Sequence, residues 1–332
     1  MIQIKLENAI AELKKLKVKR VLLQAPEGLK TQLNAIVEEL ENAGFEIISE
    51  MGPCFGACDI KQSEAKALGA QAVLHLGHTK FLEKTSLPVV YAPLKQEING
   101  FDGFAEHTAE QLAKKGEKNL ALTTTAQFLH YLPALKKALE KKGIKAEVCG
   151  GKRVEAGQVL GCNYSSADTK AKAILYMGDG MFHPLGIHFA TGKKVVIANP
   201  FVGAEGKGEV KELKDETKDF MKKRILLIEK AKESDKFAIL VSTKEGQNRI
   251  TAAEKIKKEL EAAGKGAVIC AMEFISEEKL LGLKVGAYVN TACPRISIDD
   301  YAQYKKPMIN YNEVPYLLGK KSYENYKLDF IY

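Results

Sequence analysis

One phrase, Leu-Glu-x-x-Gly, occurs three times in the 332-residue chain and constrains the fold more than any other feature. The copies are LENAG at 40–44, LEKKG at 139–143 and LEAAG at 260–264. Each ends a helical pattern with the glycine that a left-handed helix C-cap favours, and a short apolar strand follows (FEIIS, KAEVC, GAVIC). The repeat therefore predicts the same helix-to-strand crossover in three places.

Further apolar strands flank each crossover. Upstream of each helix lies a strand that runs into polar or turn residues, at 21–28, 120–127 and 238–247. Downstream strands follow at 72–79, 173–180 and 287–294, and a last strand closes each unit at 88–94, 193–200 and 306–311. Continuous apolar strands that alternate with helices are typical of parallel sheets covered on both faces.

We therefore expect an α/β protein of three related, Rossmann-like domains with parallel sheets. The predicted boundaries are 1–115, 116–230 and 231–332. In such sheets, ligands bind beyond the carboxyl ends of the strands. Residues that directly follow a strand are therefore the candidates for a functional site.

Composition excludes some classes of function. The chain has no apolar run of about 18 residues, so we expect no membrane-spanning helix. The first 20 residues form an amphipathic pattern without the features of a signal peptide, which favours a cytoplasmic protein. The net charge of +8 comes mostly from lysines, and no aromatic residues alternate with them in the lysine-rich runs. This pattern indicates solvated helix faces, and we expect no direct binding of nucleic acid.

The six cysteines of a cytoplasmic chain are poor candidates for disulfides. Cys149 and Cys270 fall in the second predicted strand of their units, where a cysteine usually behaves as a small buried hydrophobe. The other four cysteines fall in loops and are considered next.

Each unit places one loop cysteine at the carboxyl end of a strand: Cys58, Cys162 and Cys293. This distribution is expected if three domains pack around a shared point. Cys54 is then surplus. It forms no CxxxCxxC iron-sulfur signature with Cys58, because the third position of that signature is Lys61.

Three thiolates without a nearby fourth ligand suit a 4Fe-4S cluster with one open iron. Zinc is an alternative, with His75, His78 or His183 as the fourth ligand. Structural zinc sites usually take closely spaced ligands. Here Cys58 and Cys162 lie 104 positions apart, and Cys162 and Cys293 lie 131 positions apart. Unrelated thiols are the third alternative. We expect the histidines to have mainly structural roles.

Several motifs, in this order, resemble the archaeal diphthamide synthesis radical enzyme family. They are APEGL, GPCFGACD, HLGHT, GQVLGCNYS, YMGDGMFH, STKEGQ and NTACPRISIDD, and they span almost the whole chain. The resemblance implies three related α/β domains and a homodimer. It also implies a 4Fe-4S cluster with Cys58, Cys162 and Cys293 as its ligands.

The resemblance further implies the first step of diphthamide biosynthesis. The reduced cluster would cleave the Cγ–S bond of S-adenosylmethionine, giving a 3-amino-3-carboxypropyl radical and methylthioadenosine. The radical would add to the imidazole C2 of one histidine of translation elongation factor 2. An electron donor, which the sequence does not identify, would reduce the cluster.

The methionyl carboxylate then needs a cationic partner near the cluster. Arg295 is the candidate, because it follows Cys293 by two residues and is one of only five arginines. Asp299, one helical turn away, would orient Arg295 or bind the methionyl ammonium. Gln247 is a candidate polar contact to S-adenosylmethionine. The backbone around Gly178 and Asp179 would approach the nucleoside.

Two other classes of function compete with this interpretation. Quinolinate synthase shares the plan of three α/β domains and three cluster cysteines, but it acts on a small anionic substrate without S-adenosylmethionine. A non-catalytic metal-binding scaffold is the other alternative.

Overall fold

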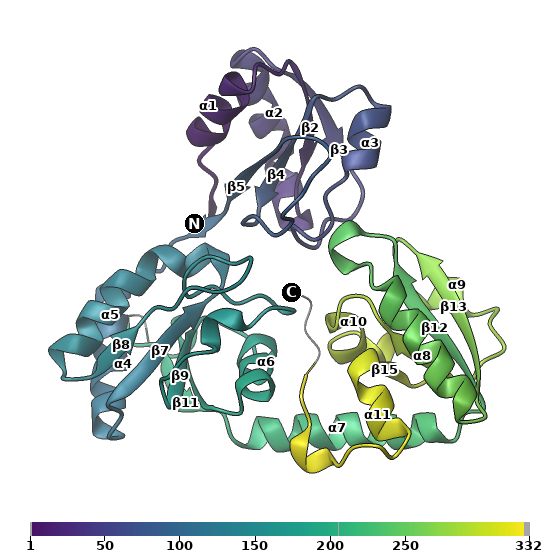
Figure 1. Cartoon of the computed structure of the whole chain (residues 1–332). Coiled ribbons are helices and arrows are strands. Elements are labelled where there is room, and N and C mark those ends of the chain that lie inside the picture. Colours follow the sequence, from purple (N-terminus) through teal and green to yellow (C-terminus); the bar gives the residue numbers. More distant parts are fainter. Residues whose placement is uncertain (1, 205, 329–332) are drawn as a thin grey trace.

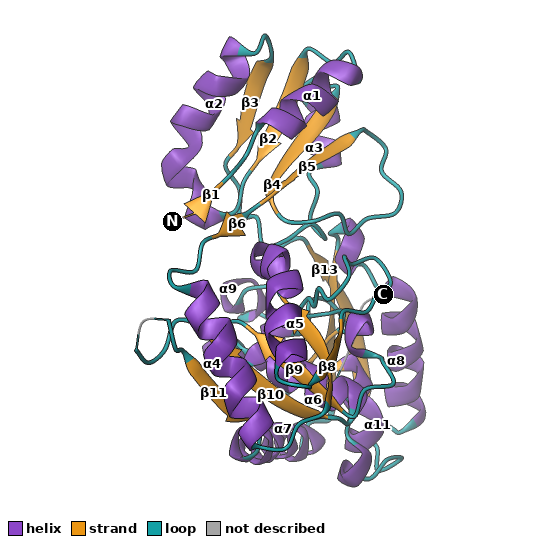
Figure 2. Cartoon of the chain, turned by 90° about the vertical axis from the view of Figure 1, so that its left-hand side faces the viewer, coloured by secondary structure: helices purple, strands orange, loops and turns teal. Residues whose placement is uncertain are grey.

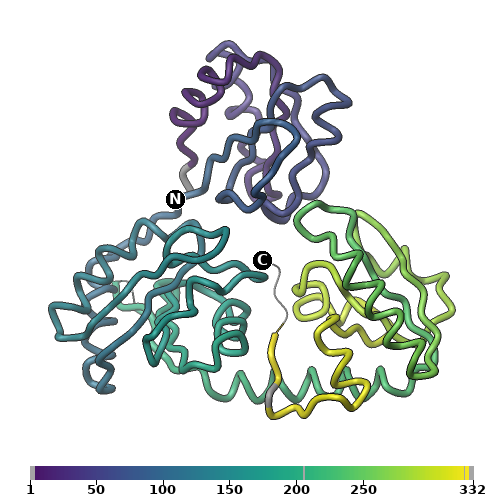
Figure 3. The backbone as a smooth tube through the Cα atoms, viewed as in Figure 1, coloured from purple at the N-terminus to yellow at the C-terminus, as the bar shows by residue number. Residues whose placement is uncertain are grey.

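The computed structural model describes residues 2–204 and 206–328. The outer ends of the first and third predicted domains, at residues 1 and 332, lie outside these ranges. The chain forms three lobes arranged as a triangle (Figure 1), and the trace passes through them in sequence order (Figure 3).

The first unit has a parallel four-stranded sheet in the order β3-β2-β4-β5. Its strands are β2 (Arg20–Gln24), β3 (Glu46–Glu50), β4 (Ala72–Gly77) and β5 (Val89–Pro93). Helices α1 (Glu7–Lys15) and α2 (Leu33–Asn42) pack on one face, and α3 (Gln62–Ala67) packs on the other with the loop before it. Figure 2 shows this sheet above the rest of the molecule. A small antiparallel pair, β1 (Ile2–Gln3) and β6 (Lys95–Gln96), joins the two ends of the unit.

The second unit has the order β11-β10-β9-β7-β8, and only β11 is antiparallel. Its strands are β7 (Asn119–Thr124), β8 (Lys145–Glu147), β9 (Ala173–Met177), β10 (Lys194–Asn199) and β11 (Glu209–Glu212). Helices α4 (Phe101–Lys114) and α5 (Leu132–Lys141) cover one face, and α6 (Phe182–Thr191) covers the other.

The third unit is a parallel sheet in the order β13-β12-β14-β15. Its strands are β12 (Lys236–Ser242), β13 (Gly266–Met272), β14 (Ala287–Asn290) and β15 (Met308–Asn310). Its helices are α8 (Ile250–Ala262), α9 (Glu277–Leu280), α10 (Arg295–Ile298) and α11 (Val314–Leu317).

The predicted crossover is present in all three units. Helices α2, α5 and α8 each end before a glycine with a positive φ: Gly44 (100°), Gly143 (76°) and Gly264 (76°). Each is followed by a strand that pairs in parallel with the strand before the helix. The second, first, third and fourth strands of each unit therefore lie in that spatial order, and the fold class predicted from the repeat is confirmed.

Two packing features lie at the predicted internal boundaries. Helix α4 packs through Phe104, Ala109 and Leu112 in the same apolar core as β7 and β9, so we propose that the second unit includes α4. The boundary at 230/231 falls inside α7 (Asp215–Lys232), which runs along the base of the triangle from the second lobe to the third (Figure 1). One continuous apolar cluster includes strands of both units, so these two lobes share a core.

Within the described ranges, we find no helix long and apolar enough to cross a membrane.

Candidate functional site

The loop that carries Cys58 is held by the third unit. The backbone N–H of Gly246 donates to the Cys58 carbonyl at 2.9 Å, and Nε2 of Gln247 donates to Cys58 Sγ at 3.2 Å. A Cβ atom on Gly246 would lie 2.6 Å from Cys58 Cα, so only glycine allows this approach. Burial raises the pKa of Cys58, and the hydrogen bond from Gln247 acts in the opposite direction.

A buried carboxylate supports the same loop. Asp59 Oδ1 lies 3.2 Å from Lys61 Nζ, and Oδ2 lies 2.6 Å from Lys244 Nζ. Lys61 also pairs with Glu273 of the third unit. Lys61, which occupies the position of the missing third signature cysteine, therefore helps to join the first and third units. The charge of Asp59 adds to the raised pKa of Cys58, and the charge of Lys244 opposes it.

The loop of Cys162 enters from the second unit. Cys162 and Cys58 both pack against the apolar cluster of the first unit that includes Leu22, Ala57 and Ile60. The neighbouring Gly161 lies against the third unit, since a Cβ atom there would be 3.3 Å from Cδ of Arg295. This loop therefore contacts both other units.

Cys293 lies between β14 and α10. Nδ2 of Asn290 donates to its carbonyl at 2.8 Å. Burial raises the pKa of Cys293 to about 12, and the nearby Cys58 adds to the shift. Burial also raises the pKa of Tyr164, and the charges of Cys162 and Cys293 contribute further. Cys58 and Cys162 pack against one cluster and Cys58 is bonded to the third unit, so the three cysteines lie near one another, in agreement with these effects.

The three cysteines do not form a compact single-ion site. Among the described residues, the group with its donor atoms all within 4.8 Å of one another consists of Cys54, His75 and His78. The sulfurs of Cys58, Cys162 and Cys293 are therefore spread more widely. A cluster of several irons needs such a spread, because its metal atoms lie between the sulfurs.

Arg295 is oriented by two neighbours at the same junction. Its Nε donates to Oδ2 of Asp299, the residue that follows α10, at 2.7 Å, and its guanidinium lies 4.8 Å from the ring centre of Phe182. Phe182 and Asp299 also line a cavity of about 340 Å³ between α6, α7 and residues 298–301. The predicted pairing of Arg295 with Asp299 is present, and it lies at the edge of this cavity.

Gly178 and Asp179 follow β9, and both residues contact the side chain of Tyr176. A Cβ atom on Gly178 would lie 2.8 Å from the Tyr176 hydroxyl, and the φ of Gly178 is 147°. The same hydroxyl lies 3.4 Å from the Asp179 carbonyl and 3.5 Å from Nδ1 of His183. Burial lowers the pKa of His183 to about 4, with Arg295 contributing, so this histidine is neutral at pH 7.

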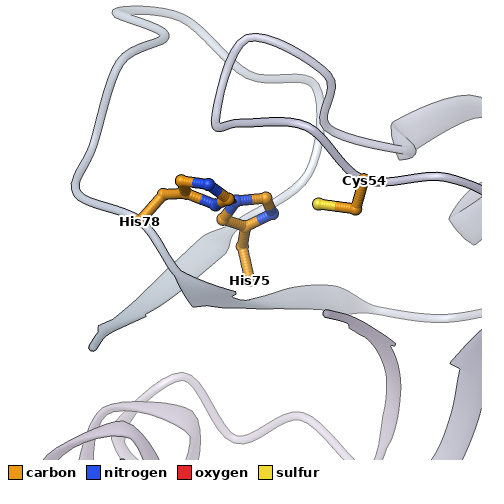
Figure 4. Close-up of side chains that lie close together, drawn as sticks. All are labelled: Cys54, His75 and His78. Atoms are coloured by element: carbon orange, nitrogen blue, oxygen red, sulfur yellow. The ribbon is translucent and has the colours of Figure 1, made fainter. Parts of the chain in front are cut away.

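The HLGH histidines group with Cys54 and not with the three other loop cysteines. In Figure 4 the side chains of His75 and His78 lie together beside the sulfur of Cys54. Burial, with a contribution from His78, lowers the pKa of His75 to about 3. Burial raises the pKa of Cys54 to about 12. Cys54, considered surplus from the sequence, therefore has a defined and buried environment.

The two strand cysteines are less buried than predicted. Cys149 lies two residues beyond the end of β8, because that strand ends at Glu147. Cys270 lies within β13, but β13 is an edge strand of its sheet. Both side chains are half-buried.

Sequence reasoning missed several residues that hold the Cys58 loop. Asp59, Lys244 and Gly246 belong to the quoted motifs GACD and STKEGQ, but no role was assigned to them. Gln24, which donates to the Asp59 carbonyl at 2.6 Å, was also missed. Their presence in the quoted motifs was the sequence signal that could have identified Asp59, Lys244 and Gly246.

Comparisons with known proteins agree with this architecture. The model of a family described as putative diphthamide synthesis protein matches residues 25–327. The 2-(3-amino-3-carboxypropyl)histidine synthase of Pyrococcus horikoshii is 36% identical over 97% of this chain and 92% of its own length. The synthase of Methanocaldococcus jannaschii is 31% identical over 94% of this chain and 87% of its own length.

A solved structure is similar over the whole chain. The crystal structure of Dph2 from P. horikoshii with a 4Fe-4S cluster has a TM-score of 0.90 and 35% sequence identity to this chain. The match covers 100% of this chain and 95% of that one.

Proposed function

Because this chain belongs to the family of putative diphthamide synthesis proteins, we propose that it catalyses the first step of diphthamide biosynthesis. In this reaction the 3-amino-3-carboxypropyl group of S-adenosylmethionine is transferred to C2 of a histidine of translation elongation factor 2. Methylthioadenosine is released. The observation that carries the proposal is the meeting of Cys58, Cys162 and Cys293, one from each unit, at the junction of the three units.

We propose that these three cysteines hold a 4Fe-4S cluster. The donor set fits, because soft thiolates are the ligands that such clusters use. The hydrogen bond from Gln247 to Cys58 Sγ is of the kind that tunes a cluster. When bound, the cluster supplies the electron that breaks the bond between the sulfonium and Cγ of S-adenosylmethionine. With three protein ligands, one iron of such a cluster would remain without a protein ligand.

Arg295 is proposed to bind the methionyl carboxylate. Its contacts with Asp299 and Phe182 limit its rotation, which reduces the entropy lost when the substrate binds. The cavity beside it has a volume in the range of small-molecule sites, and its lining carries more acidic residues (Glu216, Asp219 and Asp299) than basic ones (Lys223), which suits a cationic substrate. The chain's own contribution would thus be to hold and orient the substrate beside the cluster.

The other predicted contacts to S-adenosylmethionine, at Gln247, Gly178 and Asp179, have less support from the structure. Gln247 was predicted to contact S-adenosylmethionine, but its amide nitrogen already donates to Cys58, so we assign it to the cysteine. The backbone at Gly178 and Asp179 remains a proposed contact for the nucleoside, because these residues lie in the short loop between β9 and α6, and α6 lines the cavity.

The acceptor, the elongation factor, is proposed as the protein partner. The names of the relatives support this, since they describe a modified histidine as the product. We also propose that the chain acts as a cytoplasmic homodimer and that a separate electron donor reduces the cluster.

Product identification tests the proposal. Reconstituted protein is mixed anaerobically with dithionite and S-adenosylmethionine, and the nucleoside product is identified by mass spectrometry. Methylthioadenosine supports the proposal. Either 5′-deoxyadenosine or no turnover contradicts it, and turnover of a small anionic substrate without S-adenosylmethionine would support the quinolinate-synthase-like alternative.

Cysteine variants test the ligand assignment. Serine at Cys58, Cys162 or Cys293 is expected to abolish iron binding, whereas serine at Cys149 or Cys270 is not. A colourless, iron-free wild-type protein after strictly anaerobic purification would instead support the non-catalytic scaffold.

A further inference from the structure

The second group of soft ligands in the molecule is formed by Cys54, His75 and His78. Cys54 lies in the loop after β3, and the histidines come from β4 and the residue just after it. The two segments therefore meet at the carboxyl edge of the first sheet, where β2 lies between β3 and β4. Their donor atoms all lie within 4.8 Å of one another, and Cys54 and His75 are buried (Figure 4).

A chain of hydrogen bonds orients the His75 ring and leaves one of its nitrogens free of a proton. Nε2 of Gln24 donates to the Asp59 carbonyl at 2.6 Å, which leaves Oε1 of Gln24 as an acceptor. Nδ1 of His75 lies 3.1 Å from this oxygen and therefore carries the proton. Nε2 of His75 is left with a lone pair and points at Nδ1 of His78, 3.0 Å away. Metal-bound histidines are usually oriented in this way by a hydrogen bond from the other ring nitrogen.

We propose that Cys54, His75 and His78 bind a divalent transition-metal ion of the zinc type, at a site separate from the three-cysteine site. The proposal does not rest on the proposed function.

The distances suit one ion. With Zn–N bonds of about 2.0–2.1 Å and a Zn–S bond of about 2.3 Å, the ligand atoms of a tetrahedral site lie roughly 3.3–3.6 Å apart. The two nitrogens, at 3.0 Å, are already close to this separation. No donor pair in the group exceeds 4.8 Å, so the contraction needed is about 1.2 Å at most.

The surroundings also favour a cation. The charge of Glu50 acts on Cys54, and Oε2 of Glu50 is buried without a hydrogen-bond partner in the described structure. Two imidazoles and one thiolate are ligands that zinc prefers. His78 is only half-buried, so water can complete a four-coordinate shell.

The bound ion would join the loop of residues 51–61 to the end of β4. Cys58 lies in that loop, four residues after Cys54. The ion would therefore hold this loop to the first sheet without being required for iron binding, and it would be a structural ion and not a redox centre.

Zinc loading of the full-length, cluster-reconstituted protein tests the proposal. The protein is incubated anaerobically with Zn²⁺, freed of loosely bound metal, and analysed for zinc and iron by mass spectrometry. We expect one zinc per chain in addition to the iron. Zinc K-edge absorption should show a shell with one sulfur and two imidazoles. This measurement on the wild-type protein requires no variant to fold.

Variants then separate the two metal sites. Cys54→Ser and His78→Gln should each weaken zinc binding at least tenfold and leave the iron content unchanged. Cys270→Ser is the matched control and should keep both metals, while Cys293→Ser should lose iron and keep zinc. Circular dichroism confirms that each variant is folded.

Three results would overturn the inference: no zinc in the loaded wild-type protein, undiminished zinc in Cys54→Ser, or a zinc shell with three sulfurs, which would place the ion on the other cysteines. If Cys293→Ser keeps its iron while Cys54→Ser loses zinc, the proposed cluster site fails and the zinc site stands.

Discussion

Nε2 of Gln247 donates a hydrogen bond to Sγ of Cys58 at 3.2 Å, and the two residues come from different units, 189 positions apart. Hydrogen bonds to cluster sulfurs stabilise the reduced form, because reduction adds negative charge to the sulfurs. This contact therefore links the packing of the first and third units to the properties of the proposed cluster.

Replacing this amide tests the link. Gln247→Leu removes a hydrogen bond to a charged sulfur, which contributes about 1.5–3 kcal/mol. We expect the cluster to be retained with a lower reduction potential, measured by a redox titration followed by electron paramagnetic resonance. Gln111→Leu on α4 is the control. An unchanged potential in Gln247→Leu would show that the contact does not act on the cluster.

Gly246→Ala tests the close approach of the third unit to the Cys58 loop. The added methyl group would lie 2.6 Å from Cys58 Cα and 2.7 Å from the Cys58 carbonyl oxygen, so one backbone segment must move. Overpacking of this kind costs about 1–3 kcal/mol. We expect a lower midpoint of thermal unfolding and reduced iron content.

The matched control is Gly282→Ala, because no heavy atom lies within 4 Å of a Cβ atom there. If both glycine variants bind iron equally well, the contact of Gly246 with Cys58 is not required for the site.

A buried ion pair holds α7 to the third unit. Nε of Arg224 donates to Oε1 of Glu313 at 2.8 Å, and both side chains are almost fully buried. Glu313→Gln leaves the arginine charge without its counterion, which we expect to lower the free energy of unfolding by about 3–5 kcal/mol. Denaturation by urea measures the loss.

Glu110→Gln is the control for this pair. It breaks an exposed ion pair of 3.0 Å with Lys142, which solvent screens, so we expect little change in the free energy of unfolding. Equal losses of unfolding free energy in the two variants would show that the buried Arg224–Glu313 pair stabilises the protein no more than an exposed pair does.

Arg295→Lys tests the proposed carboxylate partner. Lysine keeps the charge but loses the planar fork and the contact with Phe182. We expect kcat/KM for S-adenosylmethionine to fall by roughly 10-fold to 100-fold, since a charge-assisted bond contributes about 1.5–3 kcal/mol. Iron content should not change. Arg153→Lys, at an exposed pair with Glu83, is the control and should behave as the wild type. Equal kcat/KM in both variants would exclude Arg295 as the partner.

The regular elements were predictable because their signals are local. The helices that end before Gly44, Gly143 and Gly264, and the apolar strands around them, follow from periodicity and capping within about 15 residues. The assignment of helices to lobes was not predictable in the same way. Helix α4 was placed in the first unit and packs in the second, because an amphipathic pattern shows that a helix has a buried face but not which sheet covers it.

The sequence by itself determined the fold class, the three-unit repeat and, with the family resemblance, the choice of Cys58, Cys162 and Cys293 as candidate ligands. Only the tertiary structure decided the environment of these residues. Gln247 and Gly246 contact Cys58, and Cys54 meets His75 and His78, because separate strands end at one edge of a sheet and three sheets meet at one junction. Such contacts depend on the packing of segments far apart in the chain, and no local pattern encodes that packing.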